Sequence, residues 1–113
     1  MSKNYSPESL SEIAGGDQEF MATVAKAFLE EIPPDLEAME SAISNNNREL
    51  AYQFAHKMKP NFEMLGMNLQ KDITTIESWT KTLKNKVTIE ENLGNVVSKV
   101  NLVLSELKED YNL

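Results

Sequence analysis

The sequence contains no cysteine, one histidine, and no apolar run approaching the roughly 18 residues that a membrane-spanning helix requires. The absence of cysteine excludes disulfide bonds, thiolate nucleophiles and cysteine-ligated zinc, and it fits a reducing compartment. The first residues hold one lysine and no apolar segment, so they do not predict a secretory signal. We therefore expect a cytoplasmic protein with no membrane association.

Positive charge is also scarce. The chain has 11 Lys and Arg against 18 Asp and Glu, a net charge of -7, and no basic cluster. Such a charge repels the phosphates of nucleic acids, so nucleic acid is not an expected partner. With 41% hydrophobic and 26% charged residues, residues 1–113 suit a single folded domain with one core. We expect this domain to be a monomer and to fold without a metal.

Apolar residues recur at helical spacing along the chain, and strand-like alternation and internal repeats are missing. A serine followed by a proline predicts a short first helix that begins at Pro7 and ends at Gly15. Asp17 is the expected N-cap of a second helix. We expect this second helix to be bent or broken at Pro33-Pro34, because proline lacks the backbone donor.

Three further helices follow. The expected core residues of the third are Leu50, Phe54, Met58, Phe62 and Leu65; those of the fourth are Leu69, Ile73, Ile76, Thr80 and Leu83. Trp79 is expected to flank the stripe of the fourth helix, and the residues Thr88 to Glu91 have the form of a capping box that opens the last helix. The sequence therefore predicts an all-α fold, an antiparallel four-helix bundle with a short additional N-terminal helix.

The single histidine, His56, is predicted to face away from the core. At about 100° per residue, it lies about 170° from the centre of the apolar stripe of its helix. The residues beside it are a mixture of aromatic, apolar and charged side chains, where a merely solvated face would be mostly charged; they are Tyr52, Lys59, Pro60, Glu63 and Met67. This mixture indicates a docking surface.

Lys59 is expected to act on whatever the histidine carries. Helical side chains lean toward the N-terminus, so Lys59 and Pro60 project over the turn that holds His56. An ammonium group there can stabilise an anionic group attached to the imidazole.

The stretch from His56 to Gly66 resembles the signature of histidine-containing phosphotransfer domains, His-x-x-Lys-Gly followed after five residues by another glycine. His56, Lys59 and Gly66 match this signature, as do the apolar residues Met58 and Leu65, whereas Pro60 stands where the family has glycine. The order of the expected helices is similar over nearly the whole chain.

The resemblance implies that His56 accepts a phosphoryl group from the aspartate of one receiver domain and passes it to the aspartate of another. The receivers would belong to a hybrid histidine kinase or a response regulator. In this family the attacking atom is Nε2, and Lys59 would stabilise the phosphoryl group. Mg²⁺ and the acceptor carboxylate come from the receiver, so the chain would be a phosphocarrier without a cofactor rather than an autonomous enzyme.

Three expectations about neighbouring residues follow. Because an acidic receiver gains little from a partner of charge -7, we expect docking through an apolar patch near His56 that includes Leu10, Ile13 and Met21. Glu63, four residues after Lys59, is expected to hold the Lys59 ammonium until a phosphoryl group competes for it. The compact ring of Pro60 is expected to keep the approach to the imidazole open.

Other functions remain open. A helical protein-protein adaptor without phosphotransfer would make His56 incidental. A di-iron site needs Glu-x-x-His twice, but the chain has one histidine and Gln53 stands three residues before it. A histidine kinase dimerisation domain is also helical, but no nucleotide-binding domain follows here. Phosphotransfer is the interpretation that the residues favour.

Overall fold

The computed structural model describes residues 4–82 and 84–113, and these form α-helices joined by short connections. The elements are α1 (Pro7–Ala14), α2 (Gln18–Ser44), α3 (Arg48–Met64), α4 (Gln70–Trp79), the 3-10 turn η1 (Lys86–Ile89) and α5 (Glu90–Tyr111). None of the described residues lies in a β-strand. The predicted all-α class is confirmed.

The first two helices begin where their capping residues predict. The Ser6 hydroxyl accepts a hydrogen bond from the Ser9 N–H at 3.1 Å, and Pro7 occupies the first turn of α1. Gly15 ends α1 with φ at 61°, a left-handed conformation that glycine adopts without strain. The Asp17 carboxylate accepts from two N–H groups in the first turn of α2.

The predicted break in the second helix does not occur, because α2 continues through Pro33 and Pro34. Each proline removes one backbone hydrogen bond. Ile32 and Leu36, on either side of the pair, are 0% and 5% exposed, so both flanking turns are packed into the core. Packing on both sides of the prolines offsets the missing hydrogen bonds.

The predicted capping box at Thr88 to Glu91 is wrong. Thr88 lies in η1, where its hydroxyl donates to the Asn85 carbonyl, and α5 begins at Glu90 without a side-chain cap. The Asn85 side chain accepts from the Val87 N–H at 3.1 Å and caps the 3-10 turn instead. Because the Thr88 hydroxyl is bonded within this turn, it does not cap α5.

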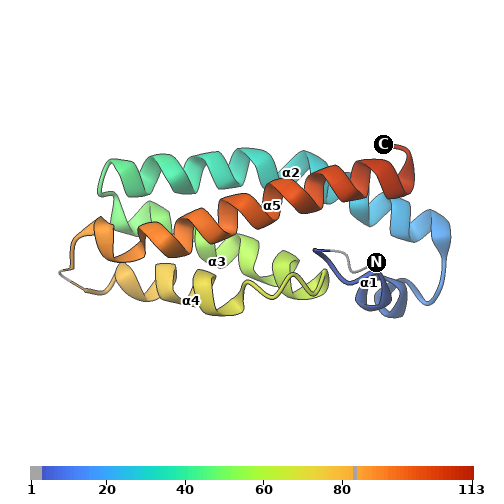
Figure 1. The fold of residues 1–113 in the computed structure, drawn as a ribbon, viewed down its shortest axis with the longest axis horizontal. Helices are drawn as coiled ribbons and strands as arrows, with labels where there is room; N and C mark the ends of the chain where they lie inside the picture. The colour runs from blue at the N-terminus through green and yellow to red at the C-terminus, as the bar shows by residue number, and fades with distance from the viewer. Residues whose placement is uncertain (1–3, 83) are drawn as a thin grey trace.

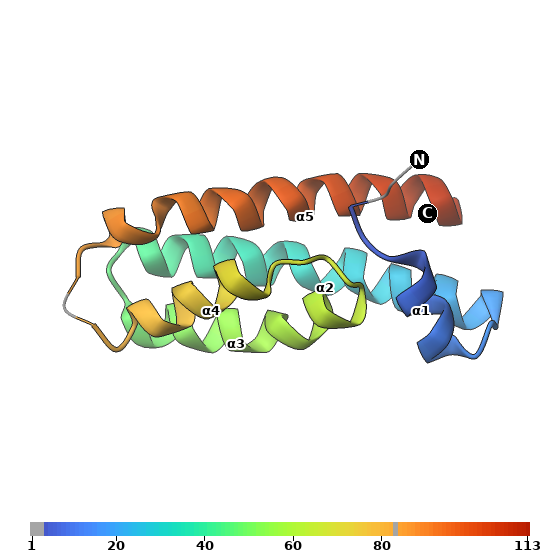
Figure 2. The ribbon, with the colours of Figure 1, turned by 60° about the horizontal axis from the view of Figure 1, so that its bottom comes forward.

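The four longer helices contact one another in a closed ring, α2 to α3, α3 to α4, α4 to α5 and α5 to α2. Consecutive helices in this ring run in opposite directions, as Figures 1 and 2 show. The short helix α1 packs on α2 and α3 at one end of a molecule that measures 46 × 21 × 21 Å. Of the helices in the described residues, none combines the length and apolar character that crossing a membrane requires.

The buried face of α3 is rotated from its predicted position. Leu50 is 40% exposed, whereas Ala51 and Ala55 are completely buried beside Met58 and Phe62. Alanine adds little to an apolar stripe read from sequence, although its small side chain allows a close approach between helices.

The predicted stripe of α4 is also corrected at its end. Trp79 is 2% exposed and belongs to the core instead of flanking it. The Arg48 guanidinium lies 4.3 Å from the centre of the indole ring and donates to the Trp79 carbonyl. Leu83 lies outside the described residues.

The N-terminal segment is tied to two helices. The Tyr5 hydroxyl donates to the Asp110 carboxylate on α5 at 2.6 Å, and Asn4 donates twice to the carboxylate of Glu106. The Ser6 N–H donates to the Leu65 carbonyl at 2.6 Å, just beyond α3.

Gly66 permits this close approach. Its φ is 58°, and a Cβ atom there would lie 2.7 Å from the Cβ of Ser6. A larger residue would therefore push the start of α1 away from the end of α3.

Tyr5 is 4% exposed, and this burial, together with its hydrogen bond to Asp110, raises the pKa of the phenol. We expect Tyr5→Phe to lower the free energy of unfolding by about 1 to 2 kcal/mol at neutral pH. Because folding favours the neutral phenol, this contribution is complete below the unfolded pKa of about 10 and is lost as the pH rises further.

The measurement is urea unfolding of the parent and Tyr5→Phe at neutral pH and at several pH values above about 10. The parent should lose stability with pH more steeply than Tyr5→Phe, and Tyr52→Phe is the matched control. A constant difference between parent and Tyr5→Phe across this range would contradict the role assigned to Tyr5.

Candidate functional site

His56 lies in the middle of α3, and its side chain is 66% exposed. The imidazole Nδ1 is 3.0 Å from Oε2 of Glu77, which α4 contributes. The Glu77 side chain is only 11% exposed, so its carboxylate lies beneath the imidazole rather than in solvent.

The same carboxylate binds Lys59. The Lys59 ammonium donates to Oε1 of Glu77 at 3.1 Å, and the lysine side chain is 28% exposed. One carboxylate therefore holds both residues that the sequence placed at the centre of the site. Each carboxylate oxygen has its own donor, which satisfies a charge that would be costly to leave unpaired at this depth.

The contact with Glu77 assigns the proton of the neutral imidazole. An ionised carboxylate only accepts hydrogen bonds, so the nitrogen that faces it must carry the hydrogen. The hydrogen-bond pattern thus places the proton on Nδ1 and leaves the lone pair of His56 on Nε2. Nε2 is the nitrogen farther from the backbone, and it belongs to a side chain that is mostly exposed.

Tyr52, one turn before His56 on α3, stacks on the imidazole. The two ring centres are 5.5 Å apart, and the ring planes differ by 9°. In the turn that follows α4, the Lys81 ammonium lies 5.8 Å from the centre of the Tyr52 ring. The imidazole is therefore held at its edge by Glu77 and at its face by Tyr52, which restricts its rotation.

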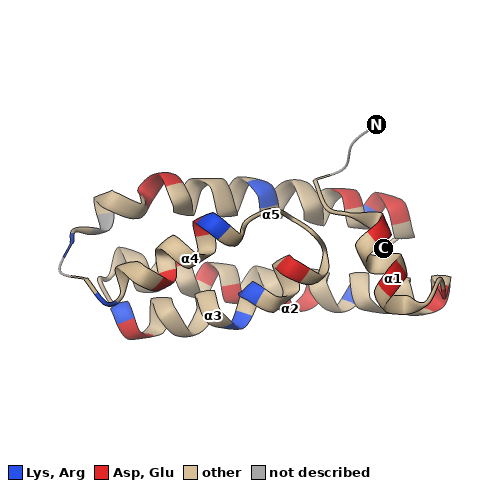
Figure 3. Ribbon diagram, turned by 90° about the horizontal axis from the view of Figure 1, so that it is seen from below, with Lys and Arg blue, Asp and Glu red and all other residues tan. Residues whose placement is uncertain are grey.

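A second ion pair joins α2 and α3 beside the histidine. The Lys57 ammonium donates to Asp35 at 3.1 Å, and Asp35 is 7% exposed. Figure 3 shows the resulting mixture of basic and acidic residues along α3 and α4. Asp35 and Glu77 are the two charged residues that are buried among the described residues, and both pair with a lysine next to His56.

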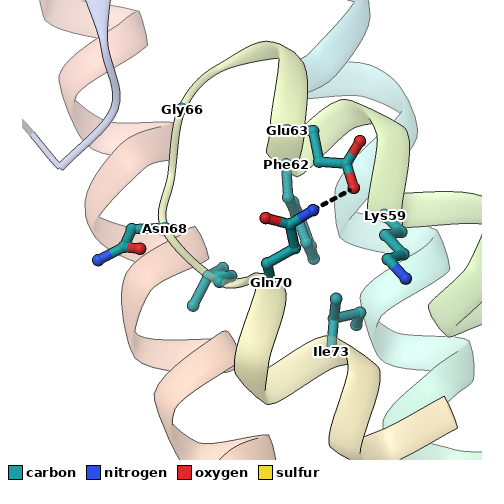
Figure 4. Close-up of a pocket in the computed structure, with 8 residues that line it drawn as sticks. Lys59, Phe62, Glu63, Gly66, Asn68, Gln70 and Ile73 are labelled. Atoms are coloured by element: carbon teal, nitrogen blue, oxygen red, sulfur yellow. Dashed lines mark hydrogen bonds between the residues drawn. The ribbon is translucent and has the colours of Figure 1, made fainter.

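The predicted pair between Lys59 and Glu63 does not form. Glu63 is exposed and accepts a hydrogen bond from the Gln70 amide at 2.8 Å, as Figure 4 shows. Lys59 binds Glu77 instead, because that carboxylate is shielded from water and attracts an ammonium more strongly than an exposed one.

The predicted apolar docking patch is corrected. Leu10 and Met21 of this patch are 0% and 5% exposed, so they pack in the core and offer no surface to a partner. The same holds for Met67, the apolar residue predicted beside His56, which is 0% exposed. Ile13 is 52% exposed, but its helix is joined at Ser6 to the end of α3, nine residues and roughly 13 Å of helix beyond His56. Leu10 and Met21 are buried because α1 packs on α2 and α3 at this end of the core.

The other predicted site residues are accessible. Pro60 is exposed one turn after His56, and α3 continues through it to Met64. Tyr52 is partly exposed.

Glu77 was not predicted, although the sequence contains a signal for it. It follows Ile76 directly in the apolar stripe of α4, where an acidic residue requires a partner.

Comparison of the chain with protein-family models, with curated protein sequences and with solved structures gave no match.

The role of Glu77 can be tested by NMR, because one histidine gives one set of imidazole signals. We expect the long-range ¹H–¹⁵N spectrum of the parent at about pH 8 to report a proton on Nδ1. Glu77→Ala should lower the population of this tautomer, because Nδ1 loses its acceptor.

Glu63→Ala is the matched control and should leave the spectrum unchanged. A His56 tautomer that is the same in the parent and in Glu77→Ala would show that the carboxylate does not orient the ring.

Proposed function

We propose that the protein is a cytoplasmic histidine phosphotransfer protein of a two-component phosphorelay, which carries a phosphoryl group on His56 between the aspartates of receiver domains. The observation that supports this most directly is an exposed imidazole whose Nδ1 is bound to Glu77, with the Lys59 ammonium on the same carboxylate. This arrangement supplies a nucleophilic nitrogen and a cation at one place.

The fold supports the same proposal. We propose that α2, α3, α4 and α5 form the antiparallel four-helix bundle of phosphotransfer domains, with α1 as the additional N-terminal helix. The closed ring of contacts among the four helices and their alternating directions favour this architecture.

The proposed reaction needs no proton transfer by the protein. The Nε2 lone pair attacks the phosphorus of an aspartyl phosphate, the N–P bond forms, and the P–O bond breaks with its electron pair going to the aspartate carboxylate. The imidazole keeps the Nδ1 proton and becomes a cation, which the Glu77 carboxylate stabilises at 3.0 Å. In the second transfer an acceptor aspartate attacks the phosphorus, and the N–P electron pair returns to Nε2.

Lys59 would stabilise the transferred group. Its ammonium is held by Glu77, so it already lies beside the imidazole before a phosphoryl group arrives. A phosphoryl group carries more negative charge than a single carboxylate and can compete for this ammonium. The receiver supplies Mg²⁺ and the acceptor aspartate, and this chain contributes the nucleophile, the cation and a docking surface.

The proposal predicts phosphorylation at His56 alone. When the chain is incubated with ³²P-labelled receiver domains from the same genome, the parent should take up acid-labile, alkali-stable label. His56→Gln should give the same circular dichroism spectrum and take up no label, because it lacks the nucleophile. Equal labelling of His56→Gln, or a parent that no phosphorylated receiver labels, would refute the proposal and leave the adaptor as the better interpretation.

Pro60 gives a separate prediction about access to His56. Pro60→Gly should preserve the transfer rate, whereas Pro60→Phe should slow it at least tenfold, because the larger ring leans over the imidazole and displaces the receiver. The fold of Pro60→Phe should be at least as stable as the parent, since residue 60 regains a donor for the His56 carbonyl. Transfer is followed by quenched flow and stability by urea unfolding. Transfer to Pro60→Phe at the parental rate would show that clearance is not the role of this proline.

A further inference from the structure

The charge of the chain is distributed unevenly around His56. Residues 48–82, which span α3 and α4, contain five Lys and Arg against four Asp and Glu, whereas the remaining residues contain six against fourteen. The net negative charge of the chain therefore comes from residues outside the segment that holds α3 and α4. Figure 3, which colours Lys and Arg blue, shows basic residues on both of these helices.

A groove lies on the N-terminal side of His56, between the first half of α3 and the end of α4. Its volume is about 560 Å³, and it is lined by Arg48, Glu49, Tyr52, Gln53, Thr80 and Lys81. The Arg48 guanidinium donates to the carbonyls of Trp79 and Lys84, which fixes it against the protein. Lys81 is exposed above Tyr52, so its ammonium is accessible to a partner.

A cavity lies on the other side of His56, between the second half of α3 and the start of α4. Its volume is about 400 Å³, and Figure 4 shows the side chains around it. Phe62, Leu69 and Ile73 line it and are at most 4% exposed, so they form an apolar floor. Lys59 stands on one side, and the hydrogen bond between Gln70 and Glu63 crosses the other.

We propose that a receiver domain docks across α3 and α4 on both sides of His56, with a carboxylate at Lys81 and an apolar side chain in the cavity beside Lys59. This inference rests on the proposed function. It replaces the docking patch on α1 and α2, in which Leu10 and Met21 are buried.

Charge complementarity favours this occupant. A partner that binds Mg²⁺ and offers an acceptor aspartate gathers carboxylates at its active site, since oxygen ligands hold this ion. Those carboxylates meet the least acidic part of this chain when the partner's aspartate faces His56. Docking over α2 would instead bring them against a helix that contains one Lys and six Asp and Glu.

The size of the surface also fits. Tyr52 and Glu63 are eleven residues apart on α3, which is roughly 16 Å of helix. A standard protein interface covers about 800 Å² on each partner, a patch roughly 30 Å across. One docked domain can therefore cover the groove, His56 and the cavity together.

The test compares two variants with two matched controls. Lys81→Glu reverses the charge in the groove, and Lys108→Glu makes the same change on α5, which does not adjoin α3 in the ring of helices. Gln70→Trp fills the mouth of the cavity from the first residue of α4, and Gln18→Trp makes the same change at the exposed first residue of α2. Circular dichroism checks the fold of each variant.

The probe is the Mg²⁺-loaded receiver domain that labels His56 most rapidly, and its Kd for each variant is measured by titration calorimetry. We expect Lys81→Glu and Gln70→Trp each to weaken binding at least fivefold, and the controls to change it less than twofold. Phosphoramidate, a small phosphodonor that needs no docking surface, should label His56 in all four variants at the parental rate.

The outcomes separate the two proposals. Variants that bind the receiver like their matched controls would refute this docking surface, while labelling of His56 by the receiver would still support the phosphocarrier. Slower labelling of Lys81→Glu by phosphoramidate would assign Lys81 to the chemistry and would also refute its role in docking. A parent that no receiver labels or binds would refute both.

Discussion

The site depends on one shielded carboxylate, that of Glu77, which joins α4 to α3. A carboxylate at 11% exposure is unfavourable unless its oxygens are paired, and here the imidazole of His56 and the ammonium of Lys59 supply the two donors. The requirement to satisfy this charge fixes three side chains at once. The orientation of the histidine is therefore set by helix packing rather than by α3 alone.

The surrounding structure maintains this contact without covering the histidine. Ala51 and Ala55 are completely buried on α3 and occupy little space, so the helix can pack closely while the imidazole on its other side remains exposed. Tyr52 shields one face of the ring, and the pair of Lys57 with Asp35 joins α3 to α2. Helices on both sides of α3 thus contribute a buried carboxylate, Glu77 to His56 and Lys59, and Asp35 to Lys57.

Much of the fold and the centre of the site could be predicted from sequence, because the signals are local. Ser6 and Asp17 cap helices through neighbours three residues away or fewer, and the spacing of His56 and Lys59 places them on one side of a helix. The contact with Glu77 could not be predicted in this way, since it spans 21 residues and depends on the rotation of two helices. The predicted core face of α3 began at Leu50 because the larger apolar residues defined it. It was misplaced because Ala51 and Ala55, which are buried, were not counted in it.

The errors at the N-terminus have one physical origin. A helical stripe indicates which residues avoid water, but it does not indicate whether a partner or the chain itself covers them. Leu10 and Met21 are covered within the chain, because α1 packs on α2 and α3. The ion pair expected between Lys59 and Glu63 does not form for a related reason. Helix spacing allows it, but Lys59 binds the better shielded carboxylate of Glu77 on α4.

Gly66 sets how far along α3 the start of α1 lies from His56. A Cβ at this position would collide with Ser6, so the glycine allows the start of α1 to pack directly against the end of α3. The residues between His56 and Gly66 separate this contact from the histidine by roughly 13 Å along α3. Under the proposed function the histidine and the lysine of the stretch serve the chemistry, whereas its last glycine keeps the start of α1 at a fixed distance along α3 from His56.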